Sequence, residues 1–285
     1  MFYLIYKEKN ISSFQAIRKF AHKNKIKKIG HTGTLDPLAS GLLLVATDED
    51  TKLIPFIEVK DKTYVTTIHF GVQTSTYDAE GEIINSSQIK IKQEDLNKIN
   101  QWLLEQTSQI PPIFSAKKVN GIRAYDLARK NKDVVLKPQN ITVYKSQVLE
   151  FDFENQILKV ELSVSNGTYI RSLVNDLALA FNTFAYMKDL ERISISNLNK
   201  DLLINKNFAK IKYQQILPSR YFDSTKEEQQ KLLMGHTLQK DLDNGIYFAR
   251  RIDNANDDSI YGIVEVNNKT LKSKNLFGNR ILKEN

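Results

Sequence analysis

The chain of 285 residues is long enough for one large domain, or for a large domain with a small partner, and its 41% hydrophobic residues are typical of a globular protein. The absence of cysteine excludes disulfides, thiolate nucleophiles and cysteine-ligated zinc, and the four histidines lack metal-ligand spacing, so we expect no metal site. A net charge of +8 favours a polyanionic partner.

The opening MFYLIYKEKNISSF has too few consecutive apolar residues for the core of a signal peptide. No apolar run approaches the roughly 20 residues that span a bilayer. We therefore expect a cytoplasmic protein that is not inserted in a membrane.

Residues 2–6 (FYLIY) predict a short buried strand. The next segment begins a helix, because Ser12 and Gln15 have the spacing of a capping box. Basic residues fall largely on one side of this helix, opposite a predicted apolar stripe. The stripe consists of Phe14, Ile17, Phe20 and Ala21.

No acid interrupts the basic run from Arg18 to His31, and this run leads into a turn-rich segment. It can be a solvated helix face, or a stripe that contacts the phosphates of a nucleic acid. A second basic segment spans 117–130, and we expect it to end in a short basic helix. The candidate phosphate contacts are Arg18, Lys19, Lys23, Lys27, Lys28, Lys117, Lys118 and Arg123.

Further along the chain, 42–47 (LLLVAT) predicts a buried strand, and 63–70 alternates so that Tyr64 shares a face with Ile68 and Phe70. We expect a polar helix over 93–108 and a strand over 157–164. An amphipathic helix follows the Ser-Asn-Gly turn, marked by Ile170, Leu173, Val174, Leu177 and Phe181. From about 221, a short polar helix and glycine-punctuated strands are typical of a small β-rich module.

One carboxylate, Asp36, lies alone in GHTGTLDPLASGLL, between glycines, a proline and an apolar run. Pro37 biases Asp36 toward an extended backbone. Gly33 and Gly41 permit tight turns or the close approach of a ligand. Asp36 can cap the next turn, or it can be a carboxylate held in place for chemistry.

Arg171 breaks a local rule of helix composition. With Thr168 as the N-cap, it would occupy the third helical position, where the helix dipole favours an acid. It can reach to solvent, or it can meet a buried carboxylate such as Asp36. Such violations are expected at functional sites.

These segments together resemble the TruB family of tRNA pseudouridine synthases. GHTGTLDPLASGLL resembles the signature loop of the family, in which the Asp is catalytic, and three further stretches follow in the family's order. They are KTYVTTIHFGVQTSTYDAEGE, PPIFSAKKVNGIRAYDLAR and VSNGTYIRSLVNDL. The resemblance covers roughly residues 3–200 and, more loosely, the tail.

The resemblance implies that Asp36 is the nucleophile or general base acting on the glycosidic bond of a target uridine. Arg171 would pair with Asp36, depress its pKa and keep it ionised. Tyr64 would lie against the uracil ring and is the candidate for proton transfer. The substrate-binding residues that the resemblance implies are His31, Tyr169, Leu190 and Lys7.

Three departures from the family pattern lie near these residues. Glu8 and Asn10 stand where the family usually has proline and glycine. Ser75 replaces an aspartate, whose role is then absent or taken by Asp78. Glu191 stands where a second basic residue is usual. These positions weaken the match around Lys7 and Leu190.

Pseudouridine forms when uracil leaves C1′, rotates and rejoins through C5, so the implied reaction needs neither cofactor nor metal. The implied function is the isomerisation of uridine 55 in the TΨC arm of tRNA by a monomer, after the base is flipped out of the RNA. The alternatives are a non-catalytic tRNA-binding or tRNA-folding protein and a guide-RNA-dependent relative. A hydrolase with an Asp nucleophile is a further alternative, but the sequence shows neither a phosphate-binding glycine loop nor a metal-binding carboxylate cluster to support it.

The resemblance also implies the fold class. We expect an α+β protein whose large mixed, mostly antiparallel sheet is flanked by helices, as in the pseudouridine synthase fold. A small C-terminal β-rich, PUA-like domain would follow. We place the catalytic domain at 1–220 and the small RNA-binding domain at 221–285.

Overall fold

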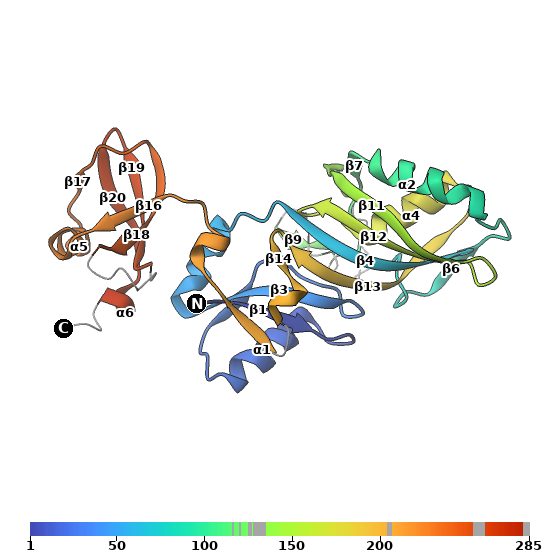
Figure 1. Ribbon diagram of the computed structural model, residues 1–285, viewed down its shortest axis with the longest axis horizontal. Coiled ribbons are helices and arrows are strands. Elements are labelled where there is room, and N and C mark those ends of the chain that lie inside the picture. The colour runs from blue at the N-terminus through green and yellow to red at the C-terminus, as the bar shows by residue number, and fades with distance from the viewer. Residues whose placement is uncertain are drawn as a thin grey trace. The chain divides into compact units, whose positions relative to one another are not determined.

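The computed structural model describes residues 1–115, 117–119, 121–124, 127, 135–203, 207–252 and 260–281. Within them, the largest element is a nine-stranded sheet in which β11, β12, β4, β13, β3, β1 and β15 lie side by side in that order (Figure 1). β2 pairs with β3, and β14 with β13. The strands are β1 (Phe2–Lys7), β2 (Ile29–His31), β3 (Ser40–Thr47), β4 (Asp61–Phe70), β11 (Val143–Asp152), β12 (Ile157–Ser165), β13 (Ala185–Ile195), β14 (Leu198–Asn199) and β15 (Phe208–Ile211).

β4 is an interior strand of this sheet, antiparallel to both β12 and β13. Its burial alternates strictly, and Tyr64, Ile68 and Phe70 share the buried face as predicted. β13 in turn runs parallel to β3. The pairing places Arg192 opposite Gly41, whose φ of +118° and close approach to the β13 backbone leave no room for a side chain.

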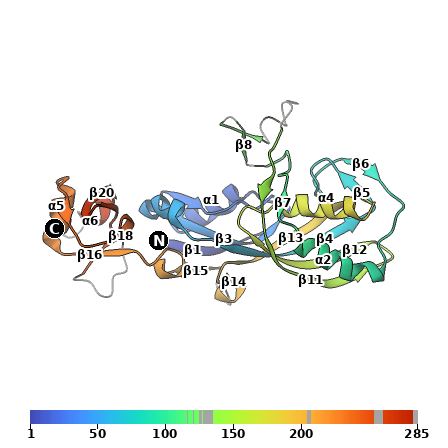
Figure 2. The same cartoon turned by 90° about the horizontal axis from the view of Figure 1, so that it is seen from above.

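The sheet is accompanied, in the described part of the chain, by the helices α1 (Ser13–Lys23), α2 (Leu96–Leu104) and α4 (Ile170–Ala180). Figure 2 shows α1 and α4 on one side of it. Apolar residues of all three helices join those of β4, β12 and β13 in one core. The predicted helix over 93–108 was too long, because a 3₁₀ turn (Gln93–Asp95) precedes α2 and the chain leaves the helix after Leu104 to form β7 (Ser108–Gln109) with β10 (Gln139–Asn140).

The capping box predicted for α1 is present: Ser12 Oγ accepts from the Gln15 amide at 3.1 Å, and Gln15 Oε1 accepts from the Ser12 amide at 2.8 Å. The predicted apolar stripe was wrong at Phe14, which is 64% exposed. The helix buries Ser13 instead, and the Arg18 guanidinium lies 5.8 Å from the centre of the Phe14 ring.

Two short hairpins extend from the loops of the sheet. One consists of β5 (Val72–Thr74) and β6 (Ile83–Ser86), the other of β8 (Lys118–Val119) and β9 (Ile122–Arg123). The short basic helix predicted at the end of the 117–130 segment falls largely outside the described residues.

The chain divides into two compact units. The larger comprises Tyr3–Thr47 and Val59–Lys210, and the smaller comprises Met1–Phe2, Asp48–Glu58 and Ile211–Asn285. A domain boundary between 220 and 221 stays a prediction.

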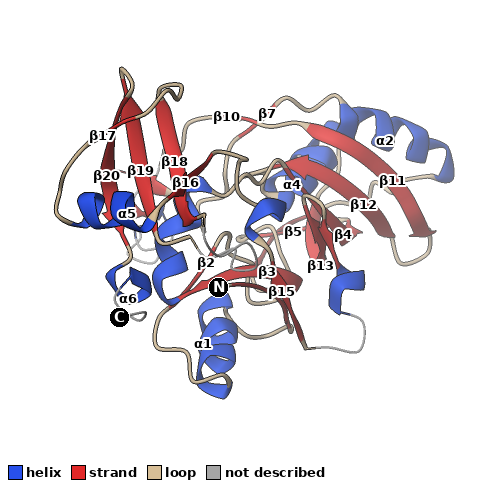
Figure 3. Cartoon of the chain, turned by 60° about the vertical axis from the view of Figure 1, so that its left-hand side comes forward, coloured by secondary structure: helices blue, strands red, loops and turns tan. Residues whose placement is uncertain are grey.

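The smaller unit contains a five-stranded sheet in the order β16, β18, β19, β20, β17 (Figures 1 and 3). Its segment 48–58 contributes the buried Asp50, which accepts from Tyr213 Oη and pairs with Arg280 Nη2, both at 2.8 Å. The elements are β16 (Tyr221–Ser224), α5 (Lys226–Leu233), β17 (Leu238–Gln239), β18 (Gly245–Arg251), β19 (Gly262–Asn267), β20 (Thr270–Leu276) and α6 (Gly278–Ile281), with 3₁₀ helices over Asp48–Phe56 and Tyr213–Gln215. A further 3₁₀ helix, Lys200–Leu203, belongs to the larger unit.

Candidate active site

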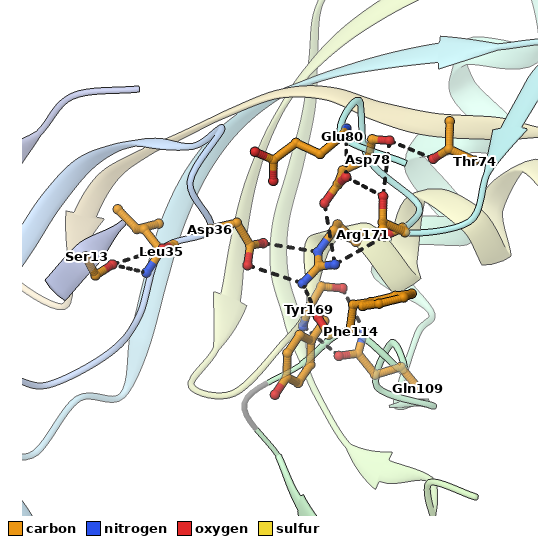
Figure 4. Close-up of polar contacts among 11 residues, drawn as sticks. Ser13, Leu35, Asp36, Thr74, Asp78, Glu80, Gln109, Phe114, Tyr169 and Arg171 are labelled. Atoms are coloured by element: carbon orange, nitrogen blue, oxygen red, sulfur yellow. Dashed lines mark hydrogen bonds and ion pairs between the residues drawn. The ribbon is translucent and has the colours of Figure 1, made fainter. Parts of the chain in front are cut away.

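Asp36 lies in the connection between β2 and β3, and the start of α1 fixes the residue before it. The hydroxyl of the buried Ser13 accepts from the Leu35 amide at 2.8 Å and donates to the Leu35 carbonyl at 2.9 Å (Figure 4). Both polar groups of Leu35 are therefore held by one side chain. The helix start thereby limits the movement of the neighbouring Asp36 backbone.

The residues after Asp36 are held by the chain between β1 and α1. Lys7 is fully buried, and its Nζ donates to the carbonyls of Pro37 at 3.2 Å and Ala39 at 2.6 Å. The Asn10 amide donates to the Pro37 carbonyl at 2.8 Å. These contacts limit the movement of the backbone after Asp36. Burial lowers the pKa of Lys7 to about 8, and the nearby Asp36 carboxylate opposes the shift.

Asn10 also explains one departure from the family pattern. Its φ is +63°, in the left-handed region where glycine is favoured and where asparagine is among the better-tolerated alternatives. The turn that glycine usually makes is therefore retained.

The predicted pairing of Asp36 with Arg171 is present. Arg171 Nε lies 3.1 Å from Asp36 Oδ2, and Nη2 lies 3.2 Å from Oδ1, so the guanidinium binds both carboxylate oxygens (Figure 4). The predicted cap was wrong by one residue, since Tyr169 and not Thr168 is the N-cap of α4. The Gln109 side chain holds that cap, accepting from the Tyr169 amide at 2.6 Å and donating to its carbonyl at 3.1 Å.

Arg171 has a second acidic neighbour, Asp78, whose Oδ2 lies 3.4 Å from Nη1. Nη1 also donates to the Thr76 carbonyl at 3.2 Å, and Nη2 donates to the Phe114 carbonyl at 2.9 Å. Asp78 is itself fixed, because its Oδ1 accepts from Thr76 Oγ1 at 2.5 Å and from the Glu80 amide at 3.0 Å. The buried guanidinium is thus oriented by three separate segments (Figure 4).

Asp78 was not among the predicted site residues. The sequence signal for it was the serine at position 75, which raised the possibility that Asp78 takes over the role of the missing acid. Ser75 is exposed, whereas Asp78 is buried against Arg171. The acidic partner is therefore supplied three residues later in the chain.

The expectation that Arg171 depresses the pKa of Asp36 was wrong in its net direction. Burial raises the pKa of Asp36 above its ordinary value, and the Asp78 carboxylate adds to this, while Arg171 and Lys7 oppose it. The desolvation of the carboxylate outweighs the ion pair. A carboxylate of raised pKa accepts a proton more readily than an exposed one does.

Tyr64 and Lys62 lie two residues apart on β4 and share its buried face. A Cβ built on Gly33 would lie only 3.1 Å from Lys62 Nζ, so this face meets the segment that carries Asp36. Tyr64 is in register with Arg192 across the β4–β13 pair. It belongs to the same core cluster as Leu35.

The remaining predicted binding residues differ in exposure. Leu190 is buried in the core cluster that contains Tyr64. Tyr169 is half-buried beside Arg171 (Figure 4), and burial raises the pKa of its hydroxyl. His31 is also half-buried, and its Nδ1 has no hydrogen-bond partner among the described residues. Burial, followed by the charge of Arg192, lowers the pKa of His31.

Glu191, the third departure, has polar partners of its own. Its Oε1 accepts from Tyr6 Oη at 2.7 Å and from Lys200 Nζ at 2.5 Å. Its neighbour Arg192 is 1% exposed and donates through Nε to the Leu42 carbonyl at 2.7 Å. Of the two adjacent basic residues that the family usually has here, this chain keeps only Arg192, and its side chain is buried.

Five candidate phosphate contacts lie in α1 and the chain after it, and all five are exposed. They are Arg18, Lys19, Lys23, Lys27 and Lys28. In the part of the chain that the structure describes, none of these five cations has an ion pair with a carboxylate. Lys117 is exposed and donates to Gln139 Oε1 at 2.6 Å. The structure describes the backbone of Lys118 and Arg123 but not their side chains.

Among the described residues, no group of three His, Asp or Glu side chains could hold a metal ion. No helix in the same part of the chain is long and apolar enough to cross a membrane.

Solved structures share this arrangement of elements. The chain aligns with the crystal structure of a Cbf5-Nop10-Gar1 complex over 99% of its own length and 81% of that chain, with a TM-score of 0.57 and 17% identity. An archaeal box H/ACA sRNP Nop10-Cbf5 complex gives the same TM-score over 96% and 86%. The chain therefore shares its fold with the aligned chains of these two complexes.

The sequence comparisons are more specific. The model of the TruB family pseudouridylate synthase N-terminal domain matches residues 19–170. A tRNA pseudouridine synthase B from Mycoplasmopsis pulmonis is 43% identical over 99% of this chain and 97% of its own. One from Mycoplasma mobile is 44% identical over 99% and 96%. The chain belongs to the TruB family.

Proposed function

We propose that the protein isomerises uridine to pseudouridine in tRNA, at position 55 of the TΨC arm. The observation that carries this proposal is the two-point hold of Arg171 on Asp36. A single oriented carboxylate is the group that this rearrangement requires. The names of the relatives, each a tRNA pseudouridine synthase B, support the choice of RNA.

The reaction is balanced without any added group. The bond between N1 of uracil and C1′ breaks, a bond between C5 and C1′ forms, C5 loses a proton and N1 gains one. Asp36 acts as nucleophile or general base, and Arg171 keeps its carboxylate oriented throughout. Tyr64 lies against the uracil ring and is the candidate for the proton transfer. His31, Tyr169 and Leu190 line the nucleotide pocket, and Lys7 supports the loop.

The target base must leave its stack, at a cost of a few kcal/mol. Contacts between RNA phosphates and the exposed cations of α1 offset this cost. Lys117, Lys118 and Arg123 add a second contact region, and the β-rich tail from 221 a third. The protein acts as a monomer in the cytoplasm, where tRNA is matured.

The direct test is to incubate the purified protein with an unmodified tRNA transcript and to map pseudouridine by mass spectrometry. We expect pseudouridine at the TΨC uridine without any guide RNA. If that uridine stays unmodified while the transcript is bound, the protein is a tRNA-binding or tRNA-folding protein. Modification that requires an added guide RNA would instead favour the guide-dependent reading.

The role of Asp36 is tested by Asp36→Asn, which preserves shape and removes the charge. We expect no detectable turnover and RNA affinity within about twofold of wild type, because phosphate contacts carry the binding. Asp201→Asn is the matched control, since Asp201 is an exposed carboxylate of the larger unit to which no RNA contact is assigned. Equal losses of binding and turnover in Asp36→Asn would mean that Asp36 is structural.

A further inference from the structure

Lys62 and Arg192 are two buried cations beside the catalytic loop that have no carboxylate partner among the described residues. Lys62 is 7% exposed, and its Nζ donates to Asn166 Oδ1 at 2.7 Å. Arg192 binds only carbonyl oxygens in the described chain, those of Leu42 and, through Nη2 at 3.2 Å, of Gly33.

Both cations meet the loop at the same point. A Cβ at Gly33 would lie 3.1 Å from Lys62 Nζ and 3.8 Å from Arg192 Nη1. Gly33 precedes Asp36 by three residues. Two residues before Gly33, the buried Nδ1 of His31 has no hydrogen-bond partner in the part of the chain that the structure describes. Two cations and a polar atom without a described partner therefore lie close to Gly33, which has no side chain of its own.

Three other cations in the described part of the chain have more polar partners than Lys62. Arg171 binds Asp36 and Asp78, and Arg280 binds Asp50. Lys7 donates to three carbonyls and lies close enough to Asp36 to feel its charge. Lys62 has one amide oxygen, and its pKa falls to about 8 because of burial and the repulsion of Arg192.

A buried ammonium without a counter-ion is costly, and proteins usually replace it or pair it. The cost at Lys62 is understandable if the counter-ion arrives with the substrate. RNA offers one kind of anion, the phosphate diester, and the binding of that anion beside the catalytic loop would neutralise both cations. This step rests on the proposed function, which supplies RNA as the substrate.

We propose that Lys62 and Arg192 form a phosphate-binding site at Gly33, which receives the backbone phosphate adjoining the uridine that is presented to Asp36. Lys62 is the direct ligand. Arg192 holds the loop by its carbonyls and adds its charge. A side chain at Gly33 would cover Lys62 Nζ, because its Cβ would lie only 3.1 Å from that atom.

The test compares Lys62→Met with Lys60→Met. Methionine keeps the apolar volume of the buried stem, and Lys60 is an exposed lysine two residues earlier. Equilibrium binding of an unmodified tRNA transcript is measured over a range of salt concentrations. We expect Lys62→Met to bind about tenfold more weakly, with a salt slope smaller by about 0.7 to 0.9, and Lys60→Met to change affinity less than about twofold.

A neutral backbone locates the contact. T-arm RNAs carry a single methylphosphonate linkage on the 5′ or the 3′ side of the target uridine. Wild type should lose about tenfold in affinity for one of the two RNAs, and Lys62→Met should lose nothing further with that RNA. Lys62→Arg retains the cation and should keep most of the salt slope, which covers the case in which Lys62→Met does not fold.

Two outcomes overturn the site. One is a Lys62→Met variant whose affinity and salt slope equal those of wild type. The other is a loss that is additive with every neutral linkage, because Lys62 then contacts neither phosphate. The site and the proposed function fail separately. A coupling between Lys62 and one linkage without any pseudouridine formation would overturn the function alone.

Discussion

Arg171 is the residue on which the candidate site converges, because it binds two carboxylates and two carbonyls from separate segments. We expect Arg171→Lys to reduce the rate of pseudouridine formation by about 100-fold or more, since one ammonium cannot reproduce the planar fork that orients Asp36. Single-turnover kinetics with saturating RNA measure the effect. Affinity for RNA should change little, and a near-normal rate would remove Arg171 from the mechanism.

The raised pKa of Asp36 has a consequence for the pH dependence. The carboxyl is inactive when protonated, so activity falls as the pH decreases through its pKa. Because burial raises that pKa, the fall should be centred above the ordinary value of about 3.9. Asp78→Asn removes a charge that raises the pKa of Asp36, so it should move the fall to lower pH.

A pH profile of single-turnover rates for both proteins tests this sign. The control is Asp223→Asn, since Asp223 lies in the smaller unit and pairs with Arg250. A profile that moves to higher pH in Asp78→Asn would contradict the assignment of Asp36 as the titrating group.

Part of the site could be predicted from residues and part could not. The Asp36–Arg171 pair was predictable, because an arginine in the first turn of an apolar helix needs a reason. Ser13 and Lys62 were missed, since a serine and a lysine normally face solvent and only tertiary packing shows that they are buried. The net pKa direction of Asp36 failed for the same reason, because sequence does not show desolvation.

At the scale of elements, α1 is more than a carrier of basic residues, because its first residue anchors the loop that contains Asp36. We expect Ser13→Ala to lower the single-turnover rate about tenfold, since Leu35 loses both hydrogen bonds and Asp36 loses its fixed position. The adjacent Ser12→Ala is a matched control. It removes only the helix cap and should cost about 1 kcal/mol of stability with the rate unchanged.

Rate and urea denaturation measured side by side separate the two serines. If both variants lose stability and neither loses rate, the contact of Ser13 with Leu35 is structural only. Restoration of the rate by Ser13→Thr, which returns the hydroxyl, would support positioning.

Strong periodicity predicted elements better than their ends. The alternation of β4 and the capping box of α1 were confirmed, because each depends on neighbours within a few residues. Phe14 was assigned to the buried face of α1 because it is more hydrophobic than Ser13. The structure buries Ser13 instead, since its hydroxyl binds the backbone of Leu35. The β7–β10 pair was missed because strands of two residues carry no periodicity.

For the whole molecule, the order of the strands in the sheet could not be predicted from local sequence patterns. β3 and β13 are neighbours although well over a hundred residues separate them, and that pairing brings Arg192 to Gly41. Only the family resemblance supplied the large sheet. The segment 48–58 likewise joins the smaller unit through tertiary contacts such as that of Asp50, which a local sequence pattern does not show.

Buried cations also give the whole molecule a dependence of stability on pH. The pKa of Lys62 is about 8 in the folded protein and 10.5 when exposed, so between these values the unfolded chain binds more protons than the native state. Stability therefore rises as pH increases across this window. Lys62→Met lacks this contribution, so we expect the free energy of unfolding of wild type, relative to the variant, to rise by about 2 kcal/mol between pH 8 and 10. Urea denaturation of both proteins at several pH values measures the difference, in which the titration of the other groups cancels. A difference that stays constant with pH would mean that Lys62 titrates as an ordinary exposed lysine, and its burial would not carry the cost from which the phosphate site was inferred.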